Sequence, residues 1–266
     1  MSQPSETLLR ALLERFKADS AEYRRMEVPA DAEDRRRVLR ALMNIRPPRP
    51  IDRDTLALQD EYLRARAMEK GAVGLEDIPI AEGCLSIWQG DITRLRVDAI
   101  VNAANSQMLG CFVPLHSCID NCIHTFAGVQ LRLACDAQMR SLREKYGPDY
   151  EQPTAVPMLT DAYNLPARKV IHIVGPIVYD RLTPELEGAL AACYANTLDL
   201  CLENGLRSVA FCCISTGVFR FPGDRAARIA VDTARLWLSA HPGAMERVIF
   251  NVFKDEDLAL YRELLG

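Results

Sequence analysis

Histidine and tryptophan are scarce in this sequence, which has four histidines and two tryptophans among 266 residues. The sequence also lacks a surplus of one charge, because 32 lysines and arginines face 36 aspartates and glutamates, giving a net charge of −4. This balance provides no general attraction to nucleic acid or to anionic lipid, so neither is expected as a partner. Any clustering of the scarce residue types is therefore more informative than the overall composition.

Long apolar runs are also missing, since no uninterrupted apolar stretch could span a bilayer. The first residues, MSQPSETLLR, lack a basic start followed by an apolar run, so no secretory signal is expected. The chain has nine cysteines, an odd number, and disulfides are not expected in the reducing interior of a cell. We therefore expect a cytoplasmic protein with free thiols.

Residues 1–75 have a helical character and no strand-like run. Leucines near the start recur at helical spacing, and further helices are expected at 31–43 and from residue 52 to just before residue 71. The segment RPPRP separates these helices, because proline lacks a backbone donor and restricts the residue before it. We interpret residues 1–75 as a helical N-terminal extension packed on a main domain of residues 76–266.

Residues 76–266 alternate between strand and helix signals. Continuous apolar runs, typical of strands covered on both faces, occur at 99–104, 155–159, 169–174, 208–214 and 247–253. Helical patterns occur at 119–145 (broken near Gly128), 184–203, 224–240 and 256–265. This alternation predicts a layered α/β fold with a mostly parallel sheet, in which ligands bind beyond the carboxyl ends of the strands.

Three loops near the expected strand ends carry polar residues. NAANS offers the amides of Asn102 and Asn105 to sugar hydroxyls, although asparagine also favours ordinary turns. ISTGVFRFPGD leads into a helix and could present backbone N–H groups to a diphosphate; the alternative is a simple turn with Asp224 as the helix N-cap. QGDIT carries Asp91, which could accept a hydrogen bond from an adenine amino group or merely stabilise its turn.

The stretch GCFVPLHSCIDNCIH concentrates three cysteines and two histidines. Cys111, His116 and Cys118 have the spacing C-x4-H-x-C, and two thiolates with one imidazole suit zinc. Three protein ligands would leave one tetrahedral position open, as in catalytic zinc sites. Cys122 is a possible fourth ligand, but we interpret it as a buried thiol and His124 as a core histidine. A redox pair is less favoured, because no CxxC spacing is present.

Five segments, in order, carry a resemblance to a known family: WQGDIT, DAIVNAANS, IDNCIHTFAG, DAYNLPARKVIHIVGP and ISTGVFRFP. Residues 86–253 resemble the macrodomain family, which implies a three-layer α/β/α module with a mixed, mostly parallel sheet that binds ADP-ribose. The resemblance implies that Asp91 binds the adenine amino group and that Asn102 and Asn105 face the distal ribose. Ile92 is also expected to be a ligand-binding residue. The loop implied to wrap the diphosphate consists of Ser215, Thr216, Gly217, Val218, Phe219 and Arg220.

The cysteine-rich stretch departs from the ordinary MacroD-type pattern, in which a glycine-rich loop leads into VDGAIH. Here CFVPLHSC precedes IDNCIH, and both this loop and the N-terminal extension resemble the zinc-containing macrodomain (Zn-macro) subclass. That resemblance implies Zn²⁺ held by Cys111, His116 and Cys118. Asp120 takes the position of the MacroD-type aspartate, where it could position a water, act as a base, or cap the following helix.

These features predict a zinc-dependent protein-ADP-ribosylhydrolase that removes mono-ADP-ribose from modified proteins, with Asp or Glu as the expected linkage site. Asn105, Asp120 and the three zinc ligands are the predicted catalytic residues. The alternatives are a non-catalytic ADP-ribose reader, an O-acetyl-ADP-ribose deacetylase, and a structural zinc protein whose N-terminal helices recruit a partner. The subclass also implies a sirtuin-like transferase and a lipoyl-carrier protein in the same pathway.

Overall fold

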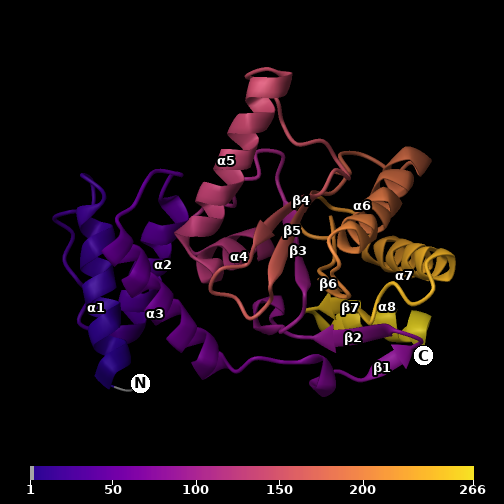
Figure 1. Ribbon diagram of the computed structural model, residues 1–266, viewed down its shortest axis with the longest axis horizontal. Helices are drawn as coiled ribbons and strands as arrows, with labels where there is room; N and C mark the ends of the chain where they lie inside the picture. Colours follow the sequence, from indigo (N-terminus) through magenta and orange to yellow (C-terminus); the bar gives the residue numbers. More distant parts are fainter. Residues whose placement is uncertain (1–2) are drawn as a thin grey trace.

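A mixed sheet forms the centre of the computed structural model (Figure 1), which describes residues 3–266. Residues 1 and 2 of the predicted extension lie outside the described residues. The strands within the described part are β1 (Ile80–Glu82), β2 (Leu85–Gln89), β3 (Ala99–Ala104), β4 (Met158–Asp161), β5 (Lys169–Val174), β6 (Ser208–Phe211) and β7 (Arg247–Val252). Their order across the sheet is β1-β2-β7-β6-β3-β5-β4. Only the outer pairs β1–β2 and β4–β5 are antiparallel among these strands, which confirms a mixed, mostly parallel sheet.

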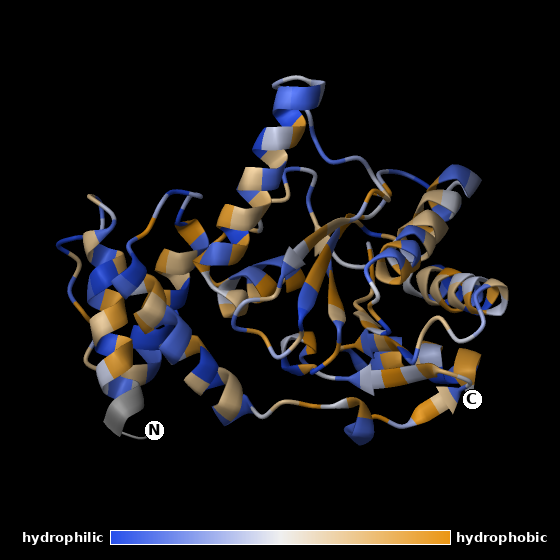
Figure 2. Ribbon diagram, viewed as in Figure 1, coloured by the Kyte–Doolittle hydropathy of each residue, from blue (hydrophilic) through white to orange (hydrophobic). Residues whose placement is uncertain are grey.

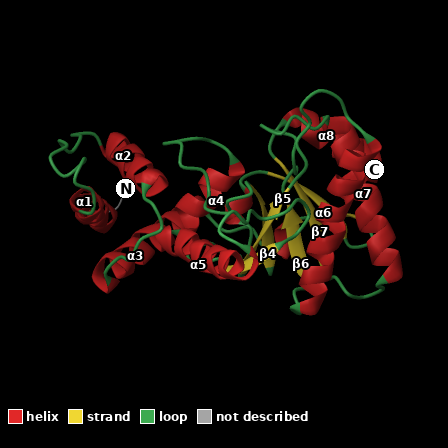
Figure 3. Cartoon of the chain, turned by 90° about the horizontal axis from the view of Figure 1, so that it is seen from above, coloured by secondary structure: helices red, strands yellow, loops and turns green. Residues whose placement is uncertain are grey.

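Helices cover both faces of this sheet and form a separate group beside it. They are α1 (Gln3–Ala18), α2 (Ala32–Ile45), α3 (Arg53–Lys70), α4 (Ile119–Ala127), α5 (Val129–Tyr146), α6 (Pro184–Glu203), α7 (Gly223–Ala240) and α8 (Asp255–Leu265), with short 3-10 turns at Leu75–Asp77 and Ile92–Arg94. Helices α4 and α5 lie on one face and α6, α7 and α8 on the other, which confirms the α/β/α layering (Figures 1 and 3). Viewed from above, α1–α3 lie beside α4 and α5, away from α6 and α7 (Figure 3). No helix among the described residues is both long and apolar enough to cross a membrane.

Several predicted boundaries differ from the structure for local reasons. The run 155–159 is a strand only from Met158, because Ala155 adopts a φ of 64° and Pro157 has no N–H to donate to a ladder. The run 208–214 leaves the sheet after Phe211. Strand β1 lacks an apolar pattern, since all three of its residues are exposed, and no strand was expected there. Asp224 is not the N-cap of α7; Pro222 takes that position and Asp224 lies in the first turn.

Two apolar cores support these elements. The larger one lies between the sheet and its flanking helices, and apolar residues run along the central strands (Figure 2). The smaller one is built by the N-terminal helices around Leu9, Leu12, Leu39 and Tyr62, and it also takes in Val129 from α5. Helices α2 and α3 both contact α4. The N-terminal helices therefore have a core of their own and are packed against the helix that carries Asp120.

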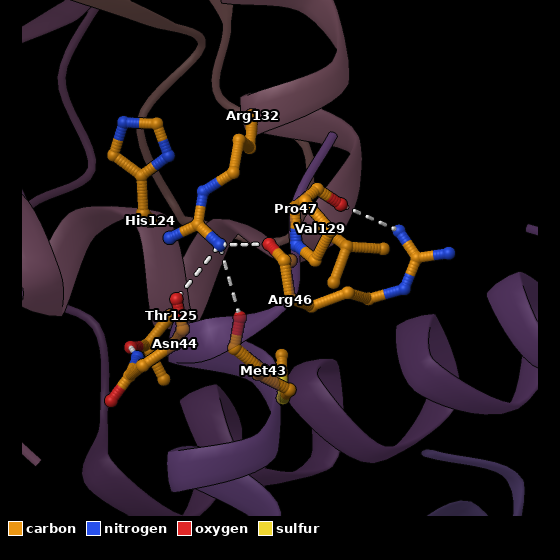
Figure 4. A pocket seen from close by; sticks show the side chains of 9 residues that line it. Met43, Asn44, Arg46, Pro47, His124, Thr125, Val129 and Arg132 are labelled. Atoms are coloured by element: carbon orange, nitrogen blue, oxygen red, sulfur yellow. Dashed lines mark hydrogen bonds between the residues drawn. The ribbon is translucent and has the colours of Figure 1, made fainter. Parts of the chain in front are cut away.

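Arg132 of α5 joins the N-terminal helices to the main sheet domain (Figure 4). Its Nη1 donates hydrogen bonds to the backbone oxygens of Met43 at 3.3 Å, of Asn44 at 2.9 Å, and of Arg46. Its Nε donates to the oxygen of Leu109 at 2.7 Å. The last carbonyls of a helix lack partners within that helix, so the Arg132 guanidinium caps the end of α2. The same side chain thereby ties α2 to the segment that precedes the cysteine-rich loop.

Candidate functional site

The polar residues predicted around the end of β3 converge on one carboxylate. Asp120, in the first turn of α4, is buried, and its Oδ1 accepts a hydrogen bond from Asn102 Nδ2 at 2.8 Å. Asn105 follows β3, and its Nδ2 lies 3.4 Å from Asp120 Oδ2 and 3.3 Å from the oxygen of Gly110. The structure therefore brings Asn102, Asn105 and Asp120 into direct contact.

The chemistry of Asp120 is set by its burial. Burial raises the pKa of this carboxyl to about 6, although the hydrogen bond from Asn102 and the positive charge of Arg132 act in the opposite direction. Cys118 is the N-cap of α4, and its Sγ accepts from the N–H of Asn121, so Asp120 does not serve as the cap. Asp120 is thus a buried carboxylate that can exchange a proton near neutral pH.

A second layer of polar residues lies beneath Asn102. His172, at the centre of β5, is buried; its Nδ1 lies 3.1 Å from Asn102 Nδ2 and its Nε2 lies 3.0 Å from Thr160 Oγ1. Because an amide nitrogen donates, Nδ1 must accept, which places the proton on Nε2. Asn102 therefore donates to both Asp120 and His172. Its Oδ1 has no protein partner among the described residues, and the ribose contact predicted for Asn102 stays a prediction.

His124 closes this layer on the α4 side. Its ring is buried, with Nε2 3.6 Å from Asp120 Oδ1, and it faces the ring of His172 at a centroid distance of 5.7 Å. His124, Cys135 and His172 bring potential metal-binding atoms within 4.8 Å of one another. Both nitrogens of His172 are already engaged by Asn102 and Thr160, so we interpret this cluster as support for Asp120. The interior position of His124 matches its interpretation as a core histidine.

Cys111, His116 and Cys118 come together in the loop between Asn105 and Asp120. Their ligand atoms all lie within 4.8 Å of one another, and Cys111 Sγ lies 3.6 Å from His116 Nδ1. Zinc bonds of about 2.3 Å to sulfur and about 2.0 Å to nitrogen place tetrahedral neighbours roughly 3.6 Å apart. Burial and the adjacent Cys111 raise the pKa of Cys118 to about 12, so a thiolate there requires a cation to balance it. The donor set and its spacing fit a metal ion.

Cys122 lies outside this set. It is half-buried, and burial raises the pKa of its thiol. Its Sγ lies 3.6 Å from Nη2 of Arg40, which comes from α2. The three-residue donor group within the described structure does not include it, and its thiol, which was expected to be buried, is only half-buried.

The N-terminal helices hold the cysteine-rich loop from the side of α2. Arg40 Nη2 donates to the backbone oxygen of His116 at 2.7 Å and to Asn121 Oδ1 at 2.9 Å. Asn44 Oδ1 accepts from the N–H of Leu115 at 3.0 Å. Asn121 in turn donates from Nδ2 to the oxygens of Cys111 and Val113. The loop that carries the thiols therefore depends on two side chains of the extension.

Gly110 begins this loop in a conformation that suits glycine. Its φ is 79°, and a Cβ at this position would lie 2.7 Å from the ring of His124. The backbone therefore lies directly against the imidazole that neighbours Asp120. One residue beyond Cys111, the ring of Phe112 packs on the Arg132 guanidinium at 4.2 Å. These contacts fix the start of the loop.

Asp91 is the N-cap of the 3-10 turn Ile92–Arg94 and has a cation beside it. Its Oδ1 accepts from the N–H of Thr93 at 3.0 Å and from Thr93 Oγ1 at 2.6 Å, while Oδ2 lies 3.2 Å from Lys70 Nζ. Burial alone would raise the pKa of Asp91, but these hydrogen bonds and Lys70 outweigh it and lower the pKa. Lys70 also lies 3.5 Å from the ring centre of Phe126. The side chain of Ile92 is buried, so a ligand could reach only its backbone.

The loop predicted to bind a diphosphate is held in an unusual backbone conformation at two places. Ser215 and Arg220 have φ values of 65° and 57°, which non-glycine residues seldom adopt. Ser215 is buried, and a Cβ on Gly175 would lie 2.1 Å from its Oγ. Gly175 therefore allows this loop to approach the end of β5. Thr216, Gly217, Val218 and Phe219 form the remainder of the turn before α7.

The residues that connect separate parts of the site were not predicted from the sequence. Lys70, Arg40 and Asn44 come from helices without a distinctive motif, and nothing in their local pattern pointed to the loop. His172 was read only as part of an apolar strand, although a histidine within KVIHIV is a detectable signal. Gly175 lies in the segment IVGP, whose resemblance to the family does not by itself indicate a role for the glycine.

Comparisons with known proteins agree with this geometry. The family model of the Macro domain matches residues 101–230. A protein-ADP-ribose hydrolase from Treponema medium is 46% identical over 259 residues, covering 96% of this chain and 97% of that protein. A protein-ADP-ribose hydrolase from Staphylococcus aureus is 44% identical over 241 residues, covering 90% of this chain and 88% of that protein.

A solved structure shows the same arrangement of elements. The crystal structure of the Trypanosoma brucei macrodomain in complex with ADP-ribose has a TM-score of 0.64 and 29% sequence identity, and the match covers 82% of this chain and 92% of that one. The similarity in sequence extends over nearly the whole chain, including the N-terminal helices. The chain therefore belongs to the macrodomain family.

Proposed function

We propose that this chain is a zinc-dependent hydrolase that removes mono-ADP-ribose from aspartate or glutamate side chains of modified proteins. The observation that carries the proposal is the position of two thiols and an imidazole on the loop that joins Asn105 to Asp120. The names of two relatives, each a protein-ADP-ribose hydrolase, support the hydrolytic activity. The related Trypanosoma brucei macrodomain, solved with ADP-ribose, supports the nucleotide part of the substrate.

Cys111, His116 and Cys118 would hold the zinc ion, because thiolates and imidazoles are its preferred ligands. When bound, zinc polarises an oxygen ligand and lowers the pKa of a coordinated water. A set of three protein ligands, rather than four, is typical of catalytic zinc sites. The donor set thus matches a catalytic site better than a closed structural one.

The residues of the chain itself would bind and orient the substrate. Asp91 would accept a hydrogen bond from the adenine amino group. Lys70, which now pairs with Asp91, would then either move away or stay over the ring of Phe126. Backbone N–H groups in the turn 215–219, before the N-terminus of α7, would bind the diphosphate. Asn105 would orient Asp120, and Asp120 would accept a proton from a ribose hydroxyl or water. An ester is the preferred linkage, because a carboxylate is a good leaving group.

Replacement of Cys118 by serine tests the proposal without removing the helix cap. Serine accepts the N-cap hydrogen bond that Cys118 Sγ now accepts from Asn121, so α4 keeps its first turn. We expect zinc content to fall and ADP-ribose release from an aspartate-modified peptide to decrease more than about 100-fold. Cys122→Ser, four residues along the same helix, is the matched control and should keep both properties.

The outcomes separate the alternatives. Release at the wild-type rate by a folded Cys118→Ser protein without zinc would contradict the proposal. ADP-ribose binding without release by the wild-type protein would favour a reader. Cleavage of O-acetyl-ADP-ribose but of no modified peptide would favour the deacetylase.

A further inference from the structure

A cleft lies between the N-terminal helices and α4, outside the residues assigned to ADP-ribose. Its volume is about 260 Å³, and α2, α3 and α4 all contribute to its walls. The floor is apolar and includes Leu39, Tyr62 and Phe126. A space of this kind, walled by two parts of one chain, is a common place for a binding site.

The walls of this cleft carry a local surplus of positive charge. Five cations line it: Arg36, Arg37, Arg40, Arg66 and Lys70. Three carboxylates lie against them, since Glu33 pairs with Arg36, Glu69 with Arg66 and Asp91 with Lys70. Neither Arg37 nor Arg40 has a carboxylate partner within the described part of the chain. This surplus contrasts with the net charge of −4 of the whole sequence.

Two arginines of the cleft have an Nε group without a partner, as do Arg35, Arg49 and Arg247 elsewhere in the described chain. The Nε groups of Arg36 and Arg40 are buried without an acceptor among the described residues. Buried donors of this kind are normally paired, and a carboxylate accepts from guanidinium groups in a well-defined geometry. Because the buried Nε atoms have almost no accessible surface, it is the charges of Arg37 and Arg40, which have no carboxylate partner in the described chain, that suit an occupant bringing carboxylates.

The cleft adjoins the proposed active site at two points. Arg40 donates to the backbone oxygen of His116, which belongs to the cysteine-rich loop. Lys70 pairs with Asp91, which is assigned to adenine. The modified side chain is attached at the distal ribose, which is assigned to Asn102 and Asn105 beside the cysteine-rich loop. A polypeptide leaving the site there would pass the end of the basic wall that carries Arg40.

Protein is favoured over nucleic acid as the occupant. Single-stranded nucleic acid binds through bases stacked on accessible aromatic rings. Here Tyr62 is only 6% exposed, and Lys70 covers the ring of Phe126. Acidic side chains with some apolar neighbours match both the cations and the apolar floor.

We infer that this cleft docks an acidic segment of the ADP-ribosylated protein, next to the modified residue. The inference rests on the proposed function, from which it takes the ADP-ribosylated protein as substrate. It adds that the segment of this substrate next to the modified residue is negatively charged. Electrostatic attraction between the cleft and such a segment speeds association and selects among modified proteins.

Two fluorescent peptides test the docking. Each carries one ADP-ribosylated aspartate, flanked on both sides by glutamates in the first peptide and by glutamines in the second. Binding is measured by fluorescence anisotropy and ADP-ribose release by chromatography. The wild-type protein should bind the glutamate peptide roughly tenfold tighter at low salt, and the preference should shrink as salt is added.

The variant Arg37→Gln/Arg66→Gln removes two cations that line the cleft from α2 and α3. It should lose the preference for the glutamate peptide, while its affinity for free ADP-ribose stays unchanged. The control Arg24→Gln/Arg64→Gln removes two exposed arginines outside the cleft and should keep the preference.

Binding and release distinguish the two proposals. Equal binding of both peptides by the wild-type protein, or an undiminished preference in the cleft variant, would overturn the docking inference even if ADP-ribose is released. A preference in binding without any release would support docking and contradict the proposed hydrolysis. Tighter binding of a single-stranded RNA of equal charge, lost in the cleft variant, would overturn the acidic segment in favour of nucleic acid.

Discussion

His172 lies one layer below Asp120, at the centre of β5, and its ring has no contact with solvent. Burial lowers the pKa of this imidazole to about 3. Asn102 and Thr160 engage its two nitrogens, while His124 and Cys135 face the same space. The neutral ring is thus part of the support beneath the carboxylate.

This burial makes the free energy of unfolding depend on pH. The unfolded chain binds a proton at His172 below about pH 6.5, whereas the folded chain does so only near pH 3, so stability is complete above pH 6.5 and is lost as the pH falls. Between pH 7 and pH 5, His172 should account for a loss of roughly 2 kcal/mol. When measured by urea unfolding, the free energy of unfolding of His172→Gln should fall less between pH 7 and pH 5 than that of the wild type, by a corresponding amount. Equal losses in the two proteins would show that His172 does not titrate as described.

At the scale of elements, α2 and the cysteine-rich loop behave as one unit. Arg40 and Asn44 hold the backbone at His116 and Leu115, and Arg132 of α5 caps α2. Residues that orient metal ligands without touching the metal commonly change affinity for it. The extension therefore has a direct influence on the proposed metal site.

Asn44→Ala should weaken zinc binding without unfolding the protein. Asn44 is almost fully buried, and its loss leaves the N–H of Leu115 and the hydroxyl of Thr125 without this partner. We expect an affinity for zinc lower by roughly 10- to 100-fold, measured by competition with a chromophoric chelator. Asn204→Ala, at the exposed end of α6, is the control. Unchanged affinity in Asn44→Ala would mean that the loop orders itself without α2.

At the scale of the whole molecule, stability depends on the contact between the two cores. Arg132 is buried and donates to Leu109, Met43, Asn44 and Arg46. Arg132→Ala should lower the free energy of unfolding by about 3 kcal/mol or more, because it leaves several buried carbonyls unpaired. Arg140→Ala, on the exposed side of α5, should change it by less than about 0.5 kcal/mol. Denaturant titrations compare the two, and equal values would contradict this role of Arg132.

The strands were predictable where the apolar pattern of a segment matches its position in the sheet. The apolar runs AIVNAA and KVIHIV are β3 and β5, because central parallel strands are covered on both faces. Strand β1 was missed because its residues are exposed and follow no apolar pattern. The cysteine spacing indicated which side chains would meet, since these residues are neighbours in one loop.

Contacts across long stretches of sequence were not predictable. Arg40 and His116 are 76 positions apart, and no local signal marks either as the partner of the other. The same holds for Lys70, the last residue of α3, and Asp91, which lies 21 positions later at the start of the 3-10 turn Ile92–Arg94. The chemistry of the site could thus be predicted from its loops, whereas the involvement of the N-terminal helices required the structure.

The central claim is that zinc at Cys111, His116 and Cys118 takes part in the removal of ADP-ribose. The most direct test compares ADP-ribose release from an aspartate-modified protein by the as-purified, chelated and zinc-restored protein, with circular dichroism showing an intact fold in each. Release that is lost on chelation and regained with zinc is the expected result. Equal release in all three preparations would contradict the claim and leave Asn105 and Asp120 as the groups that act on the substrate.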